Sequence, residues 1–505
     1  MHTPEERRGP AVFFRNSLES LRPYAAEYPR APLYFRLSDS AAIRTPAEAF
    51  KVLKRLSRQC FILESLEDAE GWGRYTFLGY DPKLELSCLN GELSMRNGTG
   101  LTIQTGDPGS YLKQIIADNR SPRLSELPPF QGGLVGYFSY DYIKYSESTL
   151  KLDAEDQEHF KDADMMLFDR LVAYDHLKKE AFLVASIRTD ALEENYNRAV
   201  YDLENLLGAL TEGKAEAEIP PLVIKGDFRP LFDRERYCSM VERAKTYIRE
   251  GDIFQVVLSN RLQADVEGSL FETYRVLRRL NPSPYMFYFS SDDIEIAGAS
   301  PETLIKLQDG SLSTFPLAGT RRRGRTPEED AALERELLSD PKELAEHNML
   351  VDLGRNDLGK ISRFGSVTVE KYLSVERFSH VMHIGSTVRG KIREGKTALD
   401  AVDAVLPAGT LSGAPKIRAC EIINELENNK RGLYGGAIGY IDFSGNMDTC
   451  IAIRIAFKKN GKVFVRSGAG IVADSVPERE YAECDNKMKA VLAALREASA
   501  AGGGV

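Results

Sequence analysis

Cysteine is scarce in this chain, and no cysteine occurs in a pattern typical of a disulfide framework or a metal site. The six cysteines are scattered and include no Cys-x-x-Cys pair. We therefore interpret them as reduced core residues in a reducing compartment. The Gly-x-Cys-x-Gly context of a glutamine amidotransferase nucleophile is also missing from the sequence.

Long apolar runs and an excess of positive charge are missing as well. No apolar run approaches the length that spans a bilayer, and the first residues, MHTPEERRGP, lack the apolar stretch of a signal peptide. The net charge of -9 argues against a nucleic-acid or membrane-surface binder, because such proteins need clustered Lys and Arg. We expect a soluble cytoplasmic protein with no nucleic-acid or membrane partner.

The composition is that of an ordinary globular protein, with 43% hydrophobic and 28% charged residues. A length of 505 residues favours more than one domain. A stretch rich in charge, Pro and Gly before residue 233 is the best candidate for a linker. We therefore predict an irregular arm at 1–30, an N-terminal region at 31–210, a linker at 211–232, a C-terminal domain at 233–498 and a flexible tail at 499–505.

Hydrophobic periodicity predicts several helices. Apolar residues at helical spacing indicate one helix over 193–210 and a second from Tyr237 to a stop at Gly251. A long terminal helix is expected over 476–498. Between the helices, short segments rich in β-branched and aromatic residues predict strands.

One motif occurs twice. The segment 132–137 reads GGLVGY and the segment 435–440 reads GGAIGY. Glycines at the start of a strand often mark a bulge or a close approach of two backbones. We interpret the pair as two strand starts with similar steric needs.

Two predicted helices each carry a Glu-x-x-Glu pair. In the first, Asp340 is placed to cap the helix, and Glu343 and Glu346 share a face. In the second, Glu480 and Glu483 form a line with Lys487. Hard divalent cations prefer oxygen ligands, so facing pairs of this kind could hold Mg²⁺. Taken alone, each pair is more often a solvated helix face than a metal site.

Other segments suggest an anionic ligand. Ser412 is predicted to cap a helix that follows a glycine-containing loop, and a helix start of this kind attracts carboxylate or phosphate. The segment 468–470 places two glycines directly after a predicted strand, where the backbone can approach a ligand closely; an ordinary tight turn is the alternative. Arg454 lies in an otherwise apolar strand, where a buried Arg needs an anionic partner, either a ligand or a structural ion pair. His380 and His383 are candidate bases, although a structural role is common for either.

Taken together, these residues resemble the chorismate-utilising enzymes, and most of all component I of the anthranilate synthases. The motifs that carry the resemblance are GDIFQVVLS, ASPETL, PLAGTRRRG, KELAEHNMLVDLGRND, GTLSGAPK, GGAIGY and SGAGIVADSVPEREYAE. They cover 233–494 densely, and a looser similarity covers 33–142. The resemblance implies an α+β fold in which large, mostly antiparallel sheets form a sandwich-like arrangement flanked by helices.

The resemblance also implies roles for individual residues. Glu346 and Glu483 are similar to Mg²⁺ ligands, with Glu343 and Glu480 in direct contact or just behind them. Glu302 is similar to the acid that assists departure of the ring hydroxyl, and His383 to the residue tied to pyruvate loss. The residues implied to contact the substrate are Gly319, Thr320, Thr410, Tyr434, Arg454, Gly468, Ala469, Gly470 and Lys487.

Two positions bear on which member of the family the chain resembles. Isochorismate-forming relatives place a Lys where this chain has Gln255, because they must deprotonate water, whereas ammonia needs no such base. Aminodeoxychorismate synthases commonly place a nucleophilic Lys where this chain has Ala318. Both positions favour direct amination of chorismate at ring C2 to give anthranilate. The para-aminobenzoate branch, isochorismate formation and a catalytically silent subunit stay open as alternatives.

The resemblance further implies two partners. Ammonia would come from a separate glutamine amidotransferase subunit, in a complex of two large and two small subunits. Tryptophan would act as a feedback inhibitor, in a site formed by two segments of the chain. The residues implied for that site are Glu64, Ser65, Pro284, Tyr285 and Met286, with Arg74, Tyr75 and the preceding segment 281–283 nearby.

Overall fold

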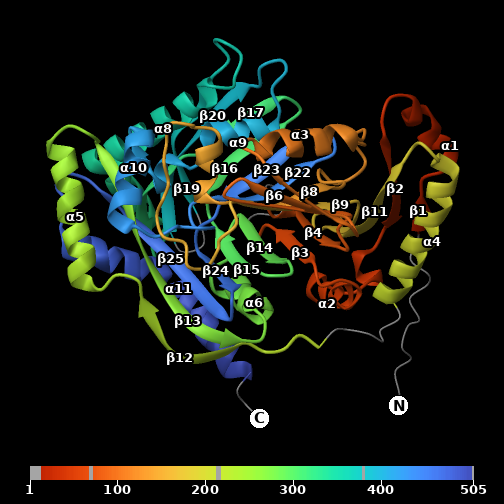
Figure 1. Ribbon diagram of the computed structural model, residues 1–505, viewed down its shortest axis with the longest axis horizontal. Coiled ribbons are helices and arrows are strands. Elements are labelled where there is room, and N and C mark those ends of the chain that lie inside the picture. Colours follow the sequence, from red (N-terminus) through yellow and green to blue (C-terminus); the bar gives the residue numbers. More distant parts are fainter. Residues whose placement is uncertain (1–12, 67–71, 212–217, 378–380, 503–505) are drawn as a thin grey trace.

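The computed structural model describes residues 13–66, 72–211, 218–377 and 381–502. Two large antiparallel sheets form its centre, and helices surround them (Figure 1). An aromatic core that includes Phe61 and Phe77 of one sheet and Tyr137 and Ile438 of the other joins the two sheets. The α+β sandwich with flanking helices is therefore confirmed.

Within the described residues, the first sheet has 13 strands. Its order is β1-β2-β11-β10-β4-β3-β14-β15-β24-β25-β13-β12, and β21 pairs with β13. The bounds are β1 Phe13–Arg15, β2 Arg30–Leu37, β3 Cys60–Glu64, β4 Tyr75–Tyr80, β10 Arg170–Asp175, β11 Glu180–Arg188, β12 Val223–Pro230, β13 Gln255–Glu267, β14 Tyr285–Ser290, β15 Glu295–Ser300, β21 Gly413–Ala414, β24 Ile455–Lys459 and β25 Lys462–Ile471.

The second sheet has 12 strands in the part of the chain that the structure describes. Its order is β18-β20-β17-β16-β23-β22-β8-β9-β5-β6-β7, and β19 pairs with β20. The bounds are β5 Leu84–Leu89, β6 Glu92–Arg96, β7 Gly100–Gln104, β8 Gly133–Phe138, β9 Ala163–Phe168, β16 Thr303–Gln308, β17 Ser311–Thr314, β18 Leu317–Arg322, β19 Thr368–Arg377, β20 Val381–Lys391, β22 Ala437–Asp442 and β23 Met447–Ile451.

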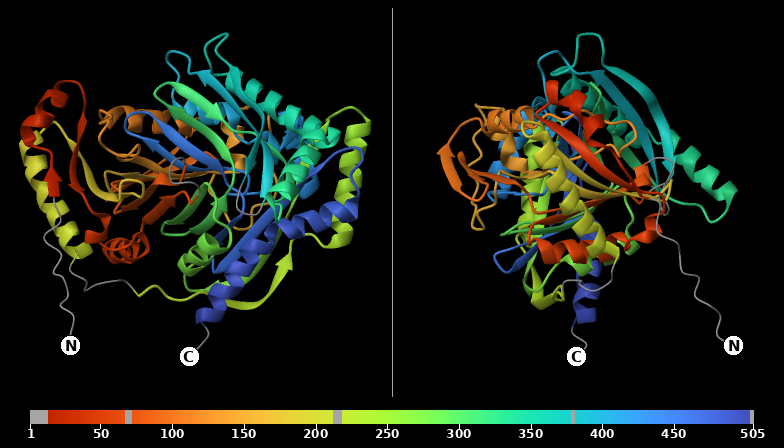
Figure 2. Two further views of the ribbon diagram at one scale, coloured as in Figure 1. Left: turned by 180° about the vertical axis from the view of Figure 1, so that it is seen from behind. Right: turned by 90° about the vertical axis from the view of Figure 1, so that its right-hand side faces the viewer.

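Helices pack on both sheets, as two further views show (Figure 2). The helices on the first sheet share apolar cores with its strands, and those on the second sheet pack in two further clusters. The first group is α1 Leu18–Leu21, α2 Pro46–Leu56, α4 Leu192–Thr211, α5 Arg234–Arg249, α6 Phe271–Leu280, α10 Lys416–Glu427 and α11 Pro477–Gly502. The second group is α3 Pro108–Asp118, α7 Pro327–Ser339, α8 Pro341–Gly359 and α9 Ala398–Val405.

Both sheets take strands from both halves of the sequence. In the first sheet, β3 pairs with β14, and in the second, β8 pairs with β22. The two halves therefore share their layers. The predicted domain boundaries stay a prediction.

The repeated glycine motifs lie side by side. Gly136 of β8 pairs with Gly439 of β22 in the middle of the second sheet. A Cβ on Gly136 would lie 2.0 Å from the Asp164 carbonyl oxygen, and one on Gly439 would lie 2.1 Å from that of Asp448. The motif is thus repeated because each strand meets a neighbouring backbone too closely for a side chain.

The helices expected over 193–210 and from Tyr237 are confirmed as α4 and α5. Other segments differ from the expectation. Part of the predicted arm is regular, because β1 pairs with β2, and part of the predicted linker forms β12, which pairs with β13. The terminal helix α11 continues into the predicted tail as far as Gly502.

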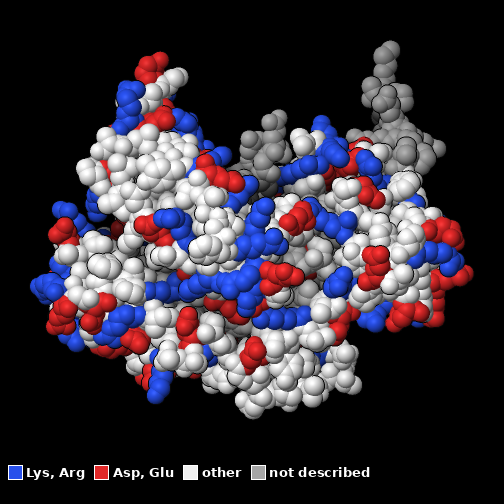
Figure 3. Space-filling model, turned by 90° about the horizontal axis from the view of Figure 1, so that it is seen from above, with Lys and Arg blue, Asp and Glu red and all other residues white. Residues whose placement is uncertain are grey.

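Two observations concern the outside of the protein. No helix of the described residues is long and apolar enough to cross a membrane. On the face seen from above, Lys and Arg side chains lie among Asp, Glu and uncharged side chains (Figure 3).

Candidate active site

Glu302 lies in the short connection between β15 and β16, opposite the 3₁₀ turn η5 (Gly409–Leu411). The Thr410 hydroxyl donates to Glu302 Oε1 at 3.3 Å. Burial raises the pKa of Glu302 to about 7, although the nearby charges of Arg454 and Lys487 oppose the shift. Near neutral pH the Glu302 carboxyl therefore holds its proton for much of the time, as a general acid must.

A small cavity adjoins Glu302 and Thr410. Its volume of about 50 Å³ gives room for a few water molecules. Its walls include the apolar Pro316, Leu353 and Val405 together with the polar Thr314 and Asp357.

Arg454 lies at a bend between β23 and β24, with a φ of 51°. The prediction of a continuous strand through this position is therefore wrong, because that backbone conformation interrupts the pairing. Among the residues described, no carboxylate forms an ion pair with Arg454, although the charge of Glu302 acts on it. Burial lowers the pKa of Arg454. Of the two interpretations of this Arg, the geometry favours contact with an anionic ligand.

The glycine segment belongs to the end of β25 rather than to a turn after it. Gly468 pairs with Ser259 of β13. A Cβ on Gly468 would lie 2.9 Å from the Tyr434 hydroxyl, and one on Gly470 would lie 2.6 Å from Nε2 of Gln255. A side chain at 468 is excluded because the Leu258 carbonyl and the Tyr434 hydroxyl lie against it, whereas one at 470 would require the end of the Gln255 side chain to move. Ala469 lies between the two glycines and is buried.

Lys487 connects this strand to α11. Its Nζ donates to the Gly468 carbonyl at 3.0 Å and pairs with Glu483 at 2.7 Å. The predicted line of Glu480, Glu483 and Lys487 along the helix therefore reaches the glycine segment.

His383 lies on β20 next to β18. Its Nδ1 lies 2.8 Å from the Gly319 carbonyl and 3.1 Å from the Thr320 hydroxyl. Because a carbonyl can only accept, Nδ1 carries the proton and Nε2 the lone pair. Burial lowers the pKa of His383, which favours the neutral ring. His380 lies outside the described residues.

The two Glu-x-x-Glu pairs lie on α8 and α11. Asp340 caps α8 as predicted, accepting from the backbone N–H groups of Lys342 and Glu343. Burial and then the charge of Glu343 raise the pKa of Glu346, and the charge of Glu483 on the other helix acts in the same direction.

Glu346 and Glu483 are therefore close enough to repel each other. A divalent cation between them would relieve this repulsion, and Mg²⁺ needs only one or two carboxylates besides water. Among the described residues, no three carboxylate, His or Cys side chains converge as a preformed metal cluster. The donor set fits a site in which water and substrate complete the coordination.

Comparison with known proteins shows the family to which this chain belongs. The profile of chorismate binding enzymes matches residues 60–493. Anthranilate synthase component 1 of Acetivibrio thermocellus is 44% identical over 494 residues, 96% of this chain and 99% of the relative. The corresponding protein of Aquifex aeolicus (strain VF5) is 44% identical over 95% of this chain and 97% of the relative. The chain belongs to the family of chorismate binding enzymes.

Solved structures of similar fold support this family assignment. The crystal structure of anthranilate synthase component I from Streptococcus pneumoniae TIGR4 is 40% identical, with a TM-score of 0.71 over 85% of this chain and 93% of that chain. The menaquinone-specific isochorismate synthase of Escherichia coli is 18% identical, with a TM-score of 0.68 over 95% and 98% of the two chains, and shares the fold.

The residues predicted to bind tryptophan come together in this chorismate binding enzyme. β3 pairs with β14, so that Glu64 lies opposite Met286. The Glu64 carboxylate accepts from Arg278 Nε at 2.7 Å and from the hydroxyl groups of Tyr274 and Thr76. The Ser65 hydroxyl is buried, with no hydrogen-bond partner among the described residues.

Two further contacts border this region. The Tyr285 hydroxyl lies 2.9 Å from that of Thr303, the residue after Glu302. Arg74 forms an ion pair with Asp175 at 2.8 Å. Pro284 lies between Ser283 and Tyr285, and the Ser283 carbonyl accepts from the Leu66 N–H at 3.3 Å.

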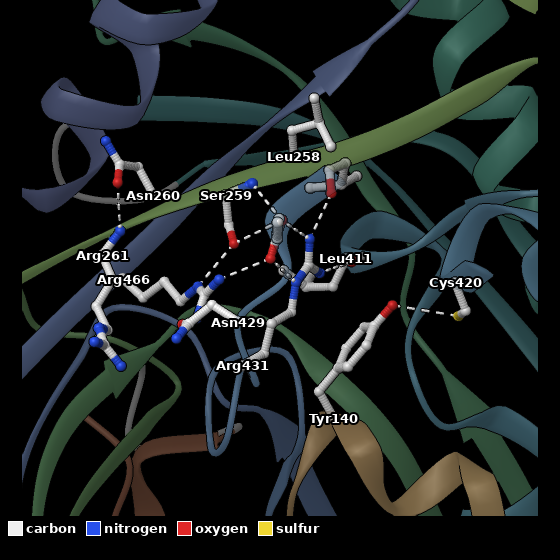
Figure 4. Close-up of polar contacts among 12 residues, drawn as sticks. Tyr140, Leu258, Ser259, Asn260, Arg261, Leu411, Cys420, Asn429, Arg431 and Arg466 are labelled. Atoms are coloured by element: carbon white, nitrogen blue, oxygen red, sulfur yellow. Dashed lines mark hydrogen bonds and ion pairs between the residues drawn. The ribbon is translucent and has the colours of Figure 1, made fainter. Parts of the chain in front are cut away.

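Sequence reasoning missed a buried polar cluster beside the site. Glu427 forms ion pairs with Arg431 at 2.5 Å and with Arg466 at 2.7 Å. Figure 4 shows the two arginines together with Ser259 and Leu411. A Glu four residues before an Arg at the end of a predicted helix could have indicated the first pair; nothing in the sequence indicates the second.

The Ser412 prediction was also wrong. The N-cap of α10 is Pro415, with no side-chain cap, and the Ser412 hydroxyl donates instead to the Ala408 carbonyl at 2.8 Å. The short strand β21 lies between Ser412 and the start of α10, so Ser412 ends the preceding turn η5 and does not cap the helix.

Proposed function

We propose that this chain is the large subunit of anthranilate synthase, which aminates chorismate at ring C2 with loss of the C4 hydroxyl and then eliminates pyruvate to give anthranilate. Identity of 44% to curated proteins of that name over nearly their whole length supports the assignment. The observation that carries the chemistry is Glu302, whose pKa of about 7 lets it protonate a leaving hydroxyl at neutral pH.

The other residues have roles that follow from their positions. Arg454 and the backbone amides of the 468–470 segment would bind the carboxylates of chorismate. Gln255 cannot deprotonate water, so ammonia is the nucleophile. Elimination of pyruvate then requires loss of the C2 proton, and the neutral His383 can accept it at Nε2.

Mg²⁺ would be held by Glu346 and Glu483, with Glu343 and Glu480 beside them. When bound, Mg²⁺ would bind the ring carboxylate of chorismate. We expect Glu483→Gln to abolish turnover while the circular dichroism spectrum is unchanged. Glu478→Gln, in the first turn of the same helix, is the matched control and should retain activity. An active Glu483→Gln protein would refute this ligand assignment.

A separate glutamine amidotransferase subunit would supply ammonia, in a complex of two large and two small subunits. Tryptophan would inhibit by binding near Ser65. The buried Ser65 hydroxyl has no hydrogen-bond partner among the described residues and could form a hydrogen bond with the inhibitor. Adding tryptophan should lower the rate of the wild type more than that of Ser65→Ala; equal inhibition would exclude this site. The cytoplasmic location stays a prediction.

The decisive experiment identifies the product from chorismate, ammonium and Mg²⁺. We expect fluorescent anthranilate with the mass and retention time of the standard. Para-aminobenzoate precursors or isochorismate would indicate a different branch, and no turnover at high ammonium would indicate a silent subunit. Gln255→Lys should raise the share of water-derived product, because the Lys supplies the missing base.

A further inference from the structure

The Glu427 cluster (Glu427, Arg431 and Arg466) is buried between β13, β25 and η5. Its members are 3%, 2% and 1% exposed, respectively. Glu427 accepts from Arg431 Nε at 3.0 Å and from Arg466 Nη2 at 2.7 Å. Burial opposes ionisation of Glu427, but the two arginine charges outweigh it and hold its pKa below the ordinary value. The cluster is therefore ionised at all physiological pH values.

The two arginines differ in their remaining hydrogen bonds. Arg431 Nη1 donates to the Leu411 carbonyl at 2.6 Å, and its Nη2 donates to the Val257 carbonyl at 2.6 Å. Arg466 donates instead to the Ser259 hydroxyl at 2.8 Å and to Asn429 Oδ1 at 3.0 Å (Figure 4). Of these two arginines, Arg431 is the one that holds the η5 turn.

Two residues of the candidate site, Thr410 and Tyr434, lie close to Arg431 or next to a residue that it binds. Leu411 directly follows Thr410, whose hydroxyl donates to Glu302. The Arg431 guanidinium also lies 5.9 Å from the centre of the Tyr434 ring. The hydroxyl of this tyrosine borders Gly468. A shift of Arg431 would therefore move the donor that faces the acid.

Stability alone does not explain these contacts. A buried ion pair is often no more stabilising than well-packed apolar residues of the same volume. A guanidinium that binds two carbonyls and a carboxylate, in contrast, fixes three segments in one geometry. Displacements of about 1 Å in a site can lower a rate by roughly 100-fold, so fixing of this kind has a direct use.

We propose that Arg431 is a positioning residue, which is held by Glu427 and fixes the Leu411 carbonyl so that the Thr410 hydroxyl meets Glu302. The effect on rate rests on the proposed function. The order of the η5 turn does not, because it can be measured without substrate.

The first test compares Arg431→Lys with Arg466→Lys by hydrogen–deuterium exchange of the full chain. A Lys can pair with Glu427, but its donors lie on one nitrogen and cannot span the carboxylate and both carbonyls as the guanidinium does. We expect peptides covering 408–415 to exchange about tenfold faster in Arg431→Lys than in the wild type or in Arg466→Lys. Equal exchange of this segment in the two variants would overturn the proposal.

The second test is a double-mutant cycle on the ammonium-dependent rate of anthranilate formation. Arg431→Lys should lower kcat about 10- to 100-fold. If Arg431 acts through Thr410, adding Thr410→Val to Arg431→Lys should cost much less than it does in the wild type. In Arg466→Lys, Thr410→Val should keep its full effect. If Thr410→Val lowers kcat by the same factor in Arg431→Lys as in Arg466→Lys, the coupling between Arg431 and Thr410 is refuted.

The two tests separate the two hypotheses. A wild type that makes no anthranilate contradicts the proposed function, while the exchange experiment still decides the role of Arg431. If Arg431→Lys does not fold, exchange of the wild type in low urea replaces it. The 408–415 and 424–434 segments should then open together, and opening of 408–415 while 424–434 stays protected would overturn the proposal.

Discussion

The candidate site and the Glu427 cluster beside it each enclose a glutamate, and the two respond to burial in opposite ways. Glu302 has a hydroxyl donor and two cations at a distance, and burial raises its pKa to about 7. Glu427 has two arginines in direct contact, and its pKa lies below the ordinary value. Direct pairing with cations therefore decides whether a buried carboxyl group holds a proton or a fixed charge.

This difference separates two tasks. A carboxyl group that exchanges its proton near pH 7 can act on a substrate, whereas one locked between arginines can only hold structure in place. The two glutamates should accordingly fail in different ways when each is replaced by its amide.

The largest expected effect is on the rate of Glu302→Gln. The amide keeps the shape and the contact with Thr410 but cannot donate a proton to the leaving hydroxyl, so kcat should fall about 10²- to 10⁴-fold. Steady-state assays with chorismate and ammonium measure this, with thermal unfolding as the control for folding. A kcat within threefold of the wild type would remove Glu302 from the role of acid.

Glu427→Gln should instead lower the free energy of unfolding. The change leaves Arg431 and Arg466 buried without their carboxylate, at a cost of about 3–5 kcal/mol. Urea denaturation measures the loss. The matched control is Glu242→Gln, which removes an exposed i,i+3 pair with Lys245 and should cost less than about 1 kcal/mol. Similar losses in the two variants would show that the cluster is not strongly coupled.

The pH dependence of stability should distinguish the two glutamates by sign. Because the folded pKa of Glu302 is raised from 4.5 to about 7, its contribution to stability is present below pH 4.5 and is lost as pH rises through 7. Unfolding measured from pH 5 to 8 should therefore show Glu302→Gln gaining about 1–3 kcal/mol relative to the wild type.

Glu427 should show the opposite behaviour in a different pH range. Its folded pKa is lowered, so its contribution is present above pH 4.5 and is lost only as pH falls through that folded value. The difference between Glu427→Gln and the wild type should be constant from pH 5 to 8. A slope of the same sign for both variants would contradict the comparison.

Contacts between residues close in the sequence could be predicted from the sequence alone, whereas contacts between distant segments could not. Local patterns sufficed for α5 and for the start of α8, because the apolar stripe of α5 and the cap at Asp340 act within a few residues. The sandwich itself was expected only from the family resemblance. The pairing of β8 with β22 joins segments about 300 residues apart, and no local pattern specifies such a contact.

For the candidate site, the types of residue were predictable and their environments were not. The sequence shows that Glu302 and Arg454 are present, but not that Glu302 meets Thr410 or that the backbone bends at Arg454. The Glu427 cluster was missed because its partner Arg466 comes from a distant strand. Whether a carboxyl group is paired is a property of the folded chain, and this property separates Glu302 from Glu427.

The smallest expected effect is a shift of the pH–rate profile when Thr410 is replaced, apart from the fall in kcat that the same replacement causes. The hydrogen bond from Thr410 lowers the pKa of this carboxyl group, against the larger effect of burial. Thr410→Val removes the donor at nearly constant volume, so the pKa of Glu302 should rise further. The rate should fall as pH rises through the pKa of the acid, and this alkaline limb should move upward by less than about one pH unit in the variant. A pH–rate profile of kcat measures the shift. A limb that moves downward would mean that the Thr410 hydroxyl stabilises the protonated acid, and that direct contacts, rather than burial, set the proton affinity of Glu302.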